Sequence, residues 1–136
     1  MKREKSCGAV IYKYENSKLY ILLLKHNQGH WSFSKGHVEN EETEKETALR
    51  EIKEETNLDV CIDNNFRYIT TYSPKENTIK DVVYFVATPL NDDIKIQEKE
   101  ISEISWYCAI EALDKITYDN DKQVLKKTIE YLNKNS

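Results

Sequence analysis

The stretch GHVENEETEKETALREIKEETNL, residues 36–58, constrains the fold most, because it specifies a helix with an acidic face. Thr43 and Glu46 have the spacing of a capping box, and apolar residues recur at helical spacing from there to Ile52. We therefore expect a helix of roughly 14 residues that starts near Thr43. The apolar stripe of such a helix has to pack against another layer of the protein.

Three glutamates, Glu51, Glu54 and Glu55, share one face of this expected helix. Carboxylates one turn apart repel each other, and an ordinary surface helix places lysines at such spacings. Clustered carboxylate oxygens suit a hard divalent cation such as Mg2+, which keeps several waters and bridges to substrate phosphates. The pattern therefore favours a metal site for phosphate chemistry, and the alternative is a solvated helix in a glutamate-rich chain.

Length and charge agree with a small enzyme. A chain of 136 residues is in the usual size range of one domain, so we expect a single domain over residues 1–136. The net charge is −4, and the acidic residues are concentrated in residues 36–58. No block of basic residues suggests a groove for duplex DNA, whereas a small nucleotide that arrives with Mg2+ remains compatible with this charge.

The cysteines and the apolar runs bear on the compartment. Cys7, Cys61 and Cys108 are odd in number and have no C-x-x-C spacing, so we expect buried, reduced thiols. The apolar stretch near the N-terminus is too short for a signal peptide, and no run approaches the ~18 apolar residues of a membrane span. These features predict a cytoplasmic protein that does not bind membranes.

Outside the acidic helix, strand-like runs outnumber helical ones. Glu15 to Lys18 has the composition of a hairpin turn, and Gly36 marks a point where the backbone must approach something closely. We expect strands at 6–14, 19–25, 59–62, 67–72, 81–88 and 104–108, a short helix at 109–113 and a C-terminal helix at 121–133.

The run 36–58 follows the pattern G-x5-E-x7-R-E-U-x-E-E-x-N-U, where U is aliphatic, and this pattern resembles the Nudix box. Asn57 stands where that family usually has glycine. The order of elements is similar to the Nudix fold, an α/β fold in which a mixed β-sheet is sandwiched between α-helices. Within the superfamily, HWSFSKGHVENEE, SCGAVIY and KDVVYFVA resemble segments of asymmetric diadenosine tetraphosphate (Ap4A) hydrolases.

This resemblance implies a metal centre on the acidic helix. It would bind one to three Mg2+ ions, for which Mn2+ can substitute, and a glutamate, Glu54 or Glu51, would act as the base toward the attacking water. Arg50 would orient one of the box glutamates, and the alternative is an ordinary surface pair with Glu46 or Glu54. The implied metal ligands are the Gly36 carbonyl, Glu51, Glu54, Glu55 and, least securely, Glu100.

The flanking residues imply a substrate site. Lys35 would contact phosphate oxygens as a point charge, and His37 would hydrogen-bond a phosphate or merely end a strand. Lys80 and Tyr84 match a family lysine that contacts phosphate and a tyrosine that stacks on adenine. The alternative for Lys35 is a solvated surface lysine, and for Tyr84 it is simple packing within a strand.

Two further departures from the family pattern lie near the box. Ser34 stands where proline is usual and Glu41 where glycine is usual, and we expect both to loosen a turn. Asn57 is less disruptive, since asparagine readily adopts the left-handed conformation at a helix end.

We therefore expect a Nudix hydrolase that splits Ap4A into ATP and AMP with Mg2+, by attack of water on phosphorus. Removal of pyrophosphate from (d)NTPs or from RNA 5′ ends is an alternative with the same chemistry. A nucleotide-binding module with little activity is a third hypothesis, and it is motivated by Ser34, Glu41 and Asn57. The sequence leaves the oligomeric state open, and a monomer is compatible with it.

Overall fold

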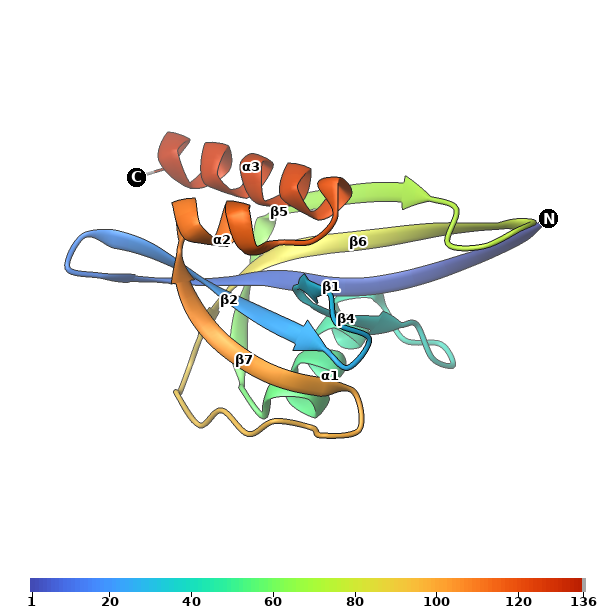
Figure 1. The fold of residues 1–136 in the computed structure, drawn as a ribbon, viewed down its shortest axis with the longest axis horizontal. Coiled ribbons are helices and arrows are strands. Elements are labelled where there is room, and N and C mark those ends of the chain that lie inside the picture. The colour runs from blue at the N-terminus through green and yellow to red at the C-terminus, as the bar shows by residue number, and fades with distance from the viewer. Residues whose placement is uncertain (136) are drawn as a thin grey trace.

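Two strands that run parallel form the centre of the sheet in the computed structural model, which describes residues 1–135 (Figure 1). These strands are β1 (Lys2–Glu15) and β6 (Thr78–Pro89). The other pairs are antiparallel, so the sheet is mixed, as expected. β5 (Val60–Tyr72) pairs with β6, β4 (Ser34–His37) and β2 (Lys18–His26) pair with β1, and β3 (Trp31–Ser32) and β7 (Ile101–Cys108) pair with β2.

Helices cover both faces of this sheet, which confirms the expected sandwich. The helix α1 (Glu44–Thr56) packs on one face, and α2 (Ala109–Lys115) and α3 (Asp119–Lys134) lie on the other (Figure 1). Side chains that alternate along β6 supply the two cores, because successive residues of a strand point to opposite faces. Val83, Phe85 and Ala87 belong to the core under α1, and Val82, Tyr84 and Val86 to the core under α3.

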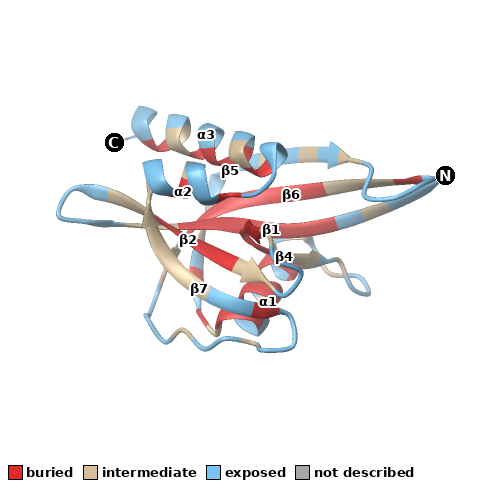
Figure 2. Cartoon of the chain, in the orientation of Figure 1, coloured by how far each residue is buried: buried red, intermediate tan, exposed pale blue. Residues whose placement is uncertain are grey.

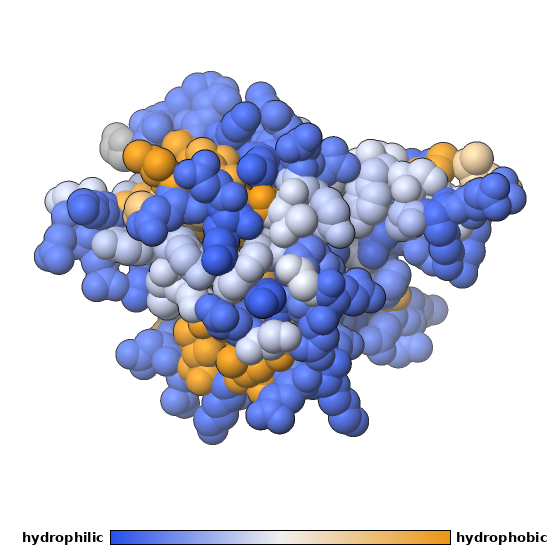
Figure 3. Space-filling view, viewed as in Figure 1, coloured by the Kyte–Doolittle hydropathy of each residue, from blue (hydrophilic) through white to orange (hydrophobic). Residues whose placement is uncertain are grey.

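The burial pattern follows these layers. The centres of the strands are buried, while the hairpin between β1 and β2 and the outer sides of the helices are exposed (Figure 2). The face in view is largely hydrophilic, with smaller apolar areas (Figure 3). Ile110 in α2 and Ile96 before β7 are among the exposed apolar residues.

The ends of α1 lie where the sequence predicts them. Thr43 is the N-cap, and its hydroxyl accepts a hydrogen bond from the Glu46 amide at 3.1 Å. The Glu46 carboxylate accepts one from the Thr43 amide at 2.8 Å, which completes the capping box. Asn57 ends the helix with φ 68°, in the left-handed conformation, so the predicted tolerance of asparagine at this position is confirmed.

Two expectations about the fold are wrong in detail. The strands expected at 59–62 and 67–72 form one strand, β5, because its pairing with β6 resumes after an irregularity between Asp63 and Tyr68. The three cysteines are free, but burial holds for Cys7 alone, since Cys61 is exposed and Cys108 is partly exposed.

Within residues 1–135 no helix is long and apolar enough to cross a membrane.

Candidate active site

The backbone of β4 packs closely against α1, which brings Glu51 to Gly36. A Cβ atom on residue 36 would lie 2.0 Å from the Glu51 Cδ atom, so a side chain there would displace the carboxylate. The predicted close approach at Gly36 is therefore confirmed, and its partner is a carboxylate of the acidic helix.

Glu55 is the most deeply buried carboxylate of α1. Its side chain is only 3% exposed, and its Oε1 atom accepts a hydrogen bond from the Ser34 hydroxyl at 2.6 Å. Burial raises the pKa of Glu55 to about 8, against the effect of the Ser34 hydrogen bond, and burial also raises the pKa of Glu51. Glu55 therefore needs a cation or a proton to be stable in this position.

The expectation that Ser34 loosens a turn is wrong, because Ser34 lies in a strand, and the expectation that Glu41 does so stays a prediction. Ser34 is a buried residue of β4, and its hydroxyl holds Glu55 in place. The turn before α1 has its left-handed residue at Asn40, with φ 52°, so Glu41 does not occupy the position that would require glycine.

Arg50 connects the turn before α1 to the acidic face. Its Nη1 atom donates to Glu51 Oε2 at 2.7 Å, and its Nε atom donates to Glu42 Oε2 at 2.6 Å. A further bond runs from Nη2 to the carbonyl of His37 at 2.9 Å. The contact with Glu54 is longer, at 3.3 Å, and within residues 1–135 no hydrogen bond or ion pair joins Arg50 to Glu46.

These contacts place a fixed positive charge behind the Glu51 carboxylate. The guanidinium of Arg50 lowers the pKa of Glu42 to about 2, and the hydrogen bond to Glu42 raises the pKa of Arg50 itself. Glu42 is the glutamate that follows Gly36 in the G-x5-E part of the pattern, and the sequence alone predicts no role for it in this cluster. Of the pairings considered for Arg50, those with the box glutamate Glu51 and with Glu54 are present, and the pairing with Glu51 is the shorter.

The acidic side chains of α1 line a cavity of about 410 Å3, which we call the acidic cavity. It contains all four expected carboxylates, including Glu100 from the loop before β7. The Glu100 carbonyl accepts a hydrogen bond from the Asn27 amide at 2.8 Å, which ties this loop to the end of β2. Besides Glu100, these carboxylates are Glu51, Glu54 and Glu55. The other lining residues that the sequence predicted are Lys35, Gly36, His37 and Lys80.

The donor set of the acidic cavity fits a hard divalent cation. Carboxylate oxygens predominate, and burial makes two of the carboxylates costly to ionise without a positive charge nearby. Within residues 1–135 no group of three or more His, Cys, Asp or Glu side chains is placed so that it could hold a metal ion, so the protein alone does not form a metal cage. An ion that keeps several of its waters and bridges to substrate phosphates does not require such a cage.

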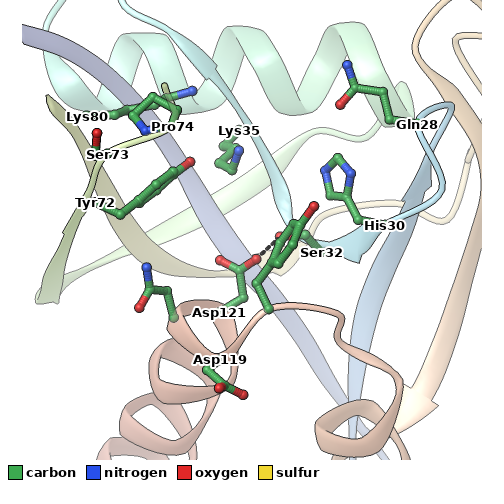
Figure 4. A pocket seen from close by; sticks show the side chains of 12 residues that line it. Gln28, His30, Ser32, Lys35, Tyr72, Ser73, Pro74, Lys80, Asp119 and Asp121 are labelled. Carbon is green, nitrogen blue, oxygen red and sulfur yellow. Dashed lines mark hydrogen bonds between the residues drawn. The ribbon is translucent and has the colours of Figure 1, made fainter. Parts of the chain in front are cut away.

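A second cavity of about 640 Å3 adjoins the first, and we call it the aromatic cavity (Figure 4). Lys35 and Lys80 line both cavities and so stand at their border. Burial, and after it the charge of Lys35, lower the pKa of Lys80. The positive charges of the two lysines therefore repel each other at this border. The remaining lining residues are Gln28, His30, Ser32, Tyr72, Ser73, Pro74, Tyr118, Asp119, Asn120 and Asp121.

The placement of Tyr84 contradicts its expected role in stacking on adenine. Its side chain has no exposed surface, its hydroxyl donates to Asp121 Oδ1 at 3.4 Å, and its ring packs edge-on against Phe33. A ring enclosed in the core cannot stack on a ligand, so the packing alternative holds. The aromatic walls of the cavity are instead Tyr72, Tyr118 and His30.

The sequence reasoning missed these walls, although one signal pointed to Tyr72. Lys80 pairs directly with Tyr72 in the register of β5 and β6. If the strand that contains Lys80 had been paired with the preceding strand as a β-hairpin, Tyr72 would have been placed beside the expected phosphate-binding Lys80. His37 has an exposed side chain, with Nε2 3.9 Å from Glu4, and so is free to reach a ligand in the acidic cavity.

Comparisons with known proteins agree with this geometry. The model of the NUDIX domain matches residues 2–128. The asymmetrical bis(5′-nucleosyl)-tetraphosphatase of Sus scrofa is 31% identical over 94% of this chain and 95% of its own length, and that of Caenorhabditis elegans is 33% identical over 94% and 96%. A crystal structure of a C. elegans Ap4A hydrolase binary complex matches with a TM-score of 0.87 at 30% identity, over 95% of this chain and 97% of the other. The chain therefore belongs to the Nudix family and is a Nudix hydrolase.

Proposed function

We propose that this hydrolase splits diadenosine tetraphosphate into ATP and AMP with Mg2+ bound in the acidic cavity. The observation that carries the proposal is the pair of adjoining cavities, one acidic and one aromatic, which share Lys35 and Lys80. A phosphate chain needs cations along its length, and a nucleoside at its end needs a flat apolar pocket. Relatives of nearly the same length that are named asymmetrical bis(5′-nucleosyl)-tetraphosphatase support the choice of substrate.

The residues of the acidic cavity divide the work between them. Glu51, Glu54, Glu55 and Glu100, with the Gly36 carbonyl, would hold Mg2+, and Mn2+ can substitute for it. A bound divalent ion would neutralise phosphate charge and lower the pKa of a coordinated water. Ser34 and Arg50 keep Glu55 and Glu51 in position through the hydrogen bonds described above.

Glu54 is the better of the two candidates for the base. The Glu51 carboxylate is nearly buried and is held by Arg50 at 2.7 Å, whereas the Glu54 side chain is 52% exposed and contacts Arg50 at 3.3 Å. A carboxylate that faces the cavity and is loosely held can accept a proton from an attacking water. Lys35, Lys80 and His37 would hold the phosphate chain in line with that water.

Glu54→Gln tests the mechanism, because it removes the base but keeps the size of the side chain. We expect kcat for Ap4A to fall by at least about a hundredfold with Mg2+ present. Glu98→Gln is the matched control, since Glu98 is exposed in the loop before β7 and does not line the acidic cavity. Unchanged turnover in a folded Glu54→Gln protein would show that the mechanism is wrong.

Product analysis tests the substrate. Relatives named 8-oxo-(d)GTP phosphatase and NAD-capped RNA hydrolase match about three quarters of this chain, at 29% and 32% identity, and keep the pyrophosphohydrolase alternative open. ATP and AMP released from Ap4A support the proposal. Release of pyrophosphate from nucleoside triphosphates, with Ap4A left intact, would favour the alternative.

A further inference from the structure

A carboxylate with no cation beside it lies at the floor of the aromatic cavity. Asp121, in the first turn of α3, is 7% exposed and points into this cavity (Figure 4). Two neutral hydroxyl groups donate to it: Ser32 Oγ to Oδ2 at 2.9 Å, and Tyr84 OH to Oδ1 at 3.4 Å. Within residues 1–135 its side chain takes part in no ion pair, so its charge is compensated by these hydroxyl groups and by more distant groups only.

Such a carboxylate retains capacity for further donors. An ionised carboxylate has about four lone-pair sites, and the two hydroxyl groups occupy two of them. Burial raises the pKa of Asp121, while the Ser32 hydrogen bond and the charge of Lys35 lower it. The donors that are missing from the protein can come from a ligand that enters the cavity.

The position of Asp121 limits what part of a nucleotide can reach it. Lys35 and Lys80 stand at the border with the acidic cavity, so the phosphates and the sugar joined to them lie near that border. Tyr72 and Asp121 line the same cavity and both point into it (Figure 4). A base that stacks against Tyr72 therefore presents its edge to Asp121.

We propose that Asp121 is a specificity-determining residue that accepts a hydrogen bond from the exocyclic amino group of the nucleobase. Adenine carries this amino group, whereas hypoxanthine carries a carbonyl oxygen at the same place, which would face the carboxylate with no hydrogen to donate. A site built to pair a donor rejects an analogue that lacks it, because the buried acceptor is left unpaired. The inference rests on the proposed function only in taking the substrate to be a nucleotide.

Binding of ATP and ITP, measured by calorimetry with Mg2+, tests this inference. We expect the wild-type protein to bind ATP at least about tenfold more tightly than ITP, since the hydrogen bond involves a charged acceptor. In Asp121→Asn, whose amide can turn either a donor or an acceptor to the base, the ratio should shrink to within about threefold. Asp114→Asn is the control, because Asp114 is exposed in α2 and lines neither cavity, so its variant should keep the wild-type ratio.

Several outcomes would overturn the inference. Equal binding of ATP and ITP by the wild-type protein would do so without any variant, as would an unchanged ratio in folded Asp121→Asn. A loss of preference between ATP and 2′-deoxy-ATP in that variant, with the ATP to ITP ratio intact, would assign Asp121 to the ribose instead. If Asp121→Asn does not fold, Asp121→Glu keeps the charge but moves the carboxylate by one methylene, and an unchanged ratio there counts against the inference.

The reaction and the recognition can fail separately. A protein that discriminates ATP from ITP through Asp121, yet leaves Ap4A uncleaved, would refute the proposed reaction and keep the inference. A protein that cleaves Ap4A and its inosine analogue equally well, in the wild type and in Asp121→Asn alike, would refute the inference and keep the reaction.

Discussion

Replacement of Glu55 by glutamine should remove a large part of the pH dependence of stability in the metal-free protein. The folded-state pKa of Glu55 is raised to about 8 from its ordinary value of 4.5. The folded protein therefore keeps a proton on Glu55 that the unfolded chain releases as the pH rises above 4.5. The stability linked to this proton is fully present below the unfolded pKa and is lost as the pH rises toward about 8.

The magnitude follows from the size of this shift. One unit of pKa corresponds to about 1.4 kcal/mol, so the wild-type protein should lose roughly 2–3 kcal/mol between about pH 5.5 and about pH 7.5 through this group. Glutamine keeps an oxygen for the Ser34 hydroxyl and cannot ionise, so the loss should be absent from Glu55→Gln. Burial lowers the pKa of His26 to about 4, and this opposite effect occurs in both proteins and cancels in the difference.

Urea unfolding in EDTA at several pH values measures the two free energies of unfolding. Mg2+ should reverse the trend for the wild-type protein, because a cation stabilises the ionised Glu55, and the gain in stability on adding Mg2+ should grow as the pH rises. Glu98→Gln, in the exposed loop before β7, should behave as the wild type does. Parallel curves for the wild type and Glu55→Gln in EDTA would refute the reasoning.

Three further predictions concern the helix ends and the two cavities. Arg50→Lys should weaken Mg2+ binding, measured by calorimetry, by about tenfold or more, because an ammonium cannot bridge both carboxylates that the planar guanidinium holds. Asn57→Ala should lower the free energy of unfolding by about 1–2 kcal/mol, whereas Asn57→Gly should stay within about 1 kcal/mol of the wild type, since residue 57 has φ 68°. Tyr72→Ala should raise KM for Ap4A at least about tenfold through loss of base stacking, and Tyr14→Ala, in the exposed β1–β2 hairpin, should leave it unchanged.

The acidic helix could be predicted in detail because its determinants are local. The capping box joins residues three apart, the left-handed Asn57 follows directly on the last turn, and the acidic face follows from helical geometry. Nothing beyond residues 43–57 is needed to define these features. The acidic face that α1 contributes to the acidic cavity can therefore be predicted from one short segment of the sequence.

The contacts that hold the acidic side chains could not be predicted in the same way. Ser34 reaches Glu55 because β4 packs on α1, and that packing depends on the missing side chain of Gly36. Glu42 reaches Arg50 because the turn before α1 folds back over the helix. Both are contacts between elements, and periodicity within one element carries no information about them.

Tyr84 and Tyr72 show why the substrate is harder to predict than the chemistry. The alternation of side chains along β6 puts Tyr84 on the α3 face of the sheet, but it does not say whether that point is open or covered. α3 and Phe33 cover Tyr84, while Tyr72 sits at the end of β5, where the cavity begins. Whether a tyrosine is covered or open therefore depends on where α3, far along the chain, begins. The first turn of α3 brings Asp121 to the cavity floor. If the proposed function is right, the acidic cavity can therefore keep its reaction while changes in α3 alter the base that is recognised.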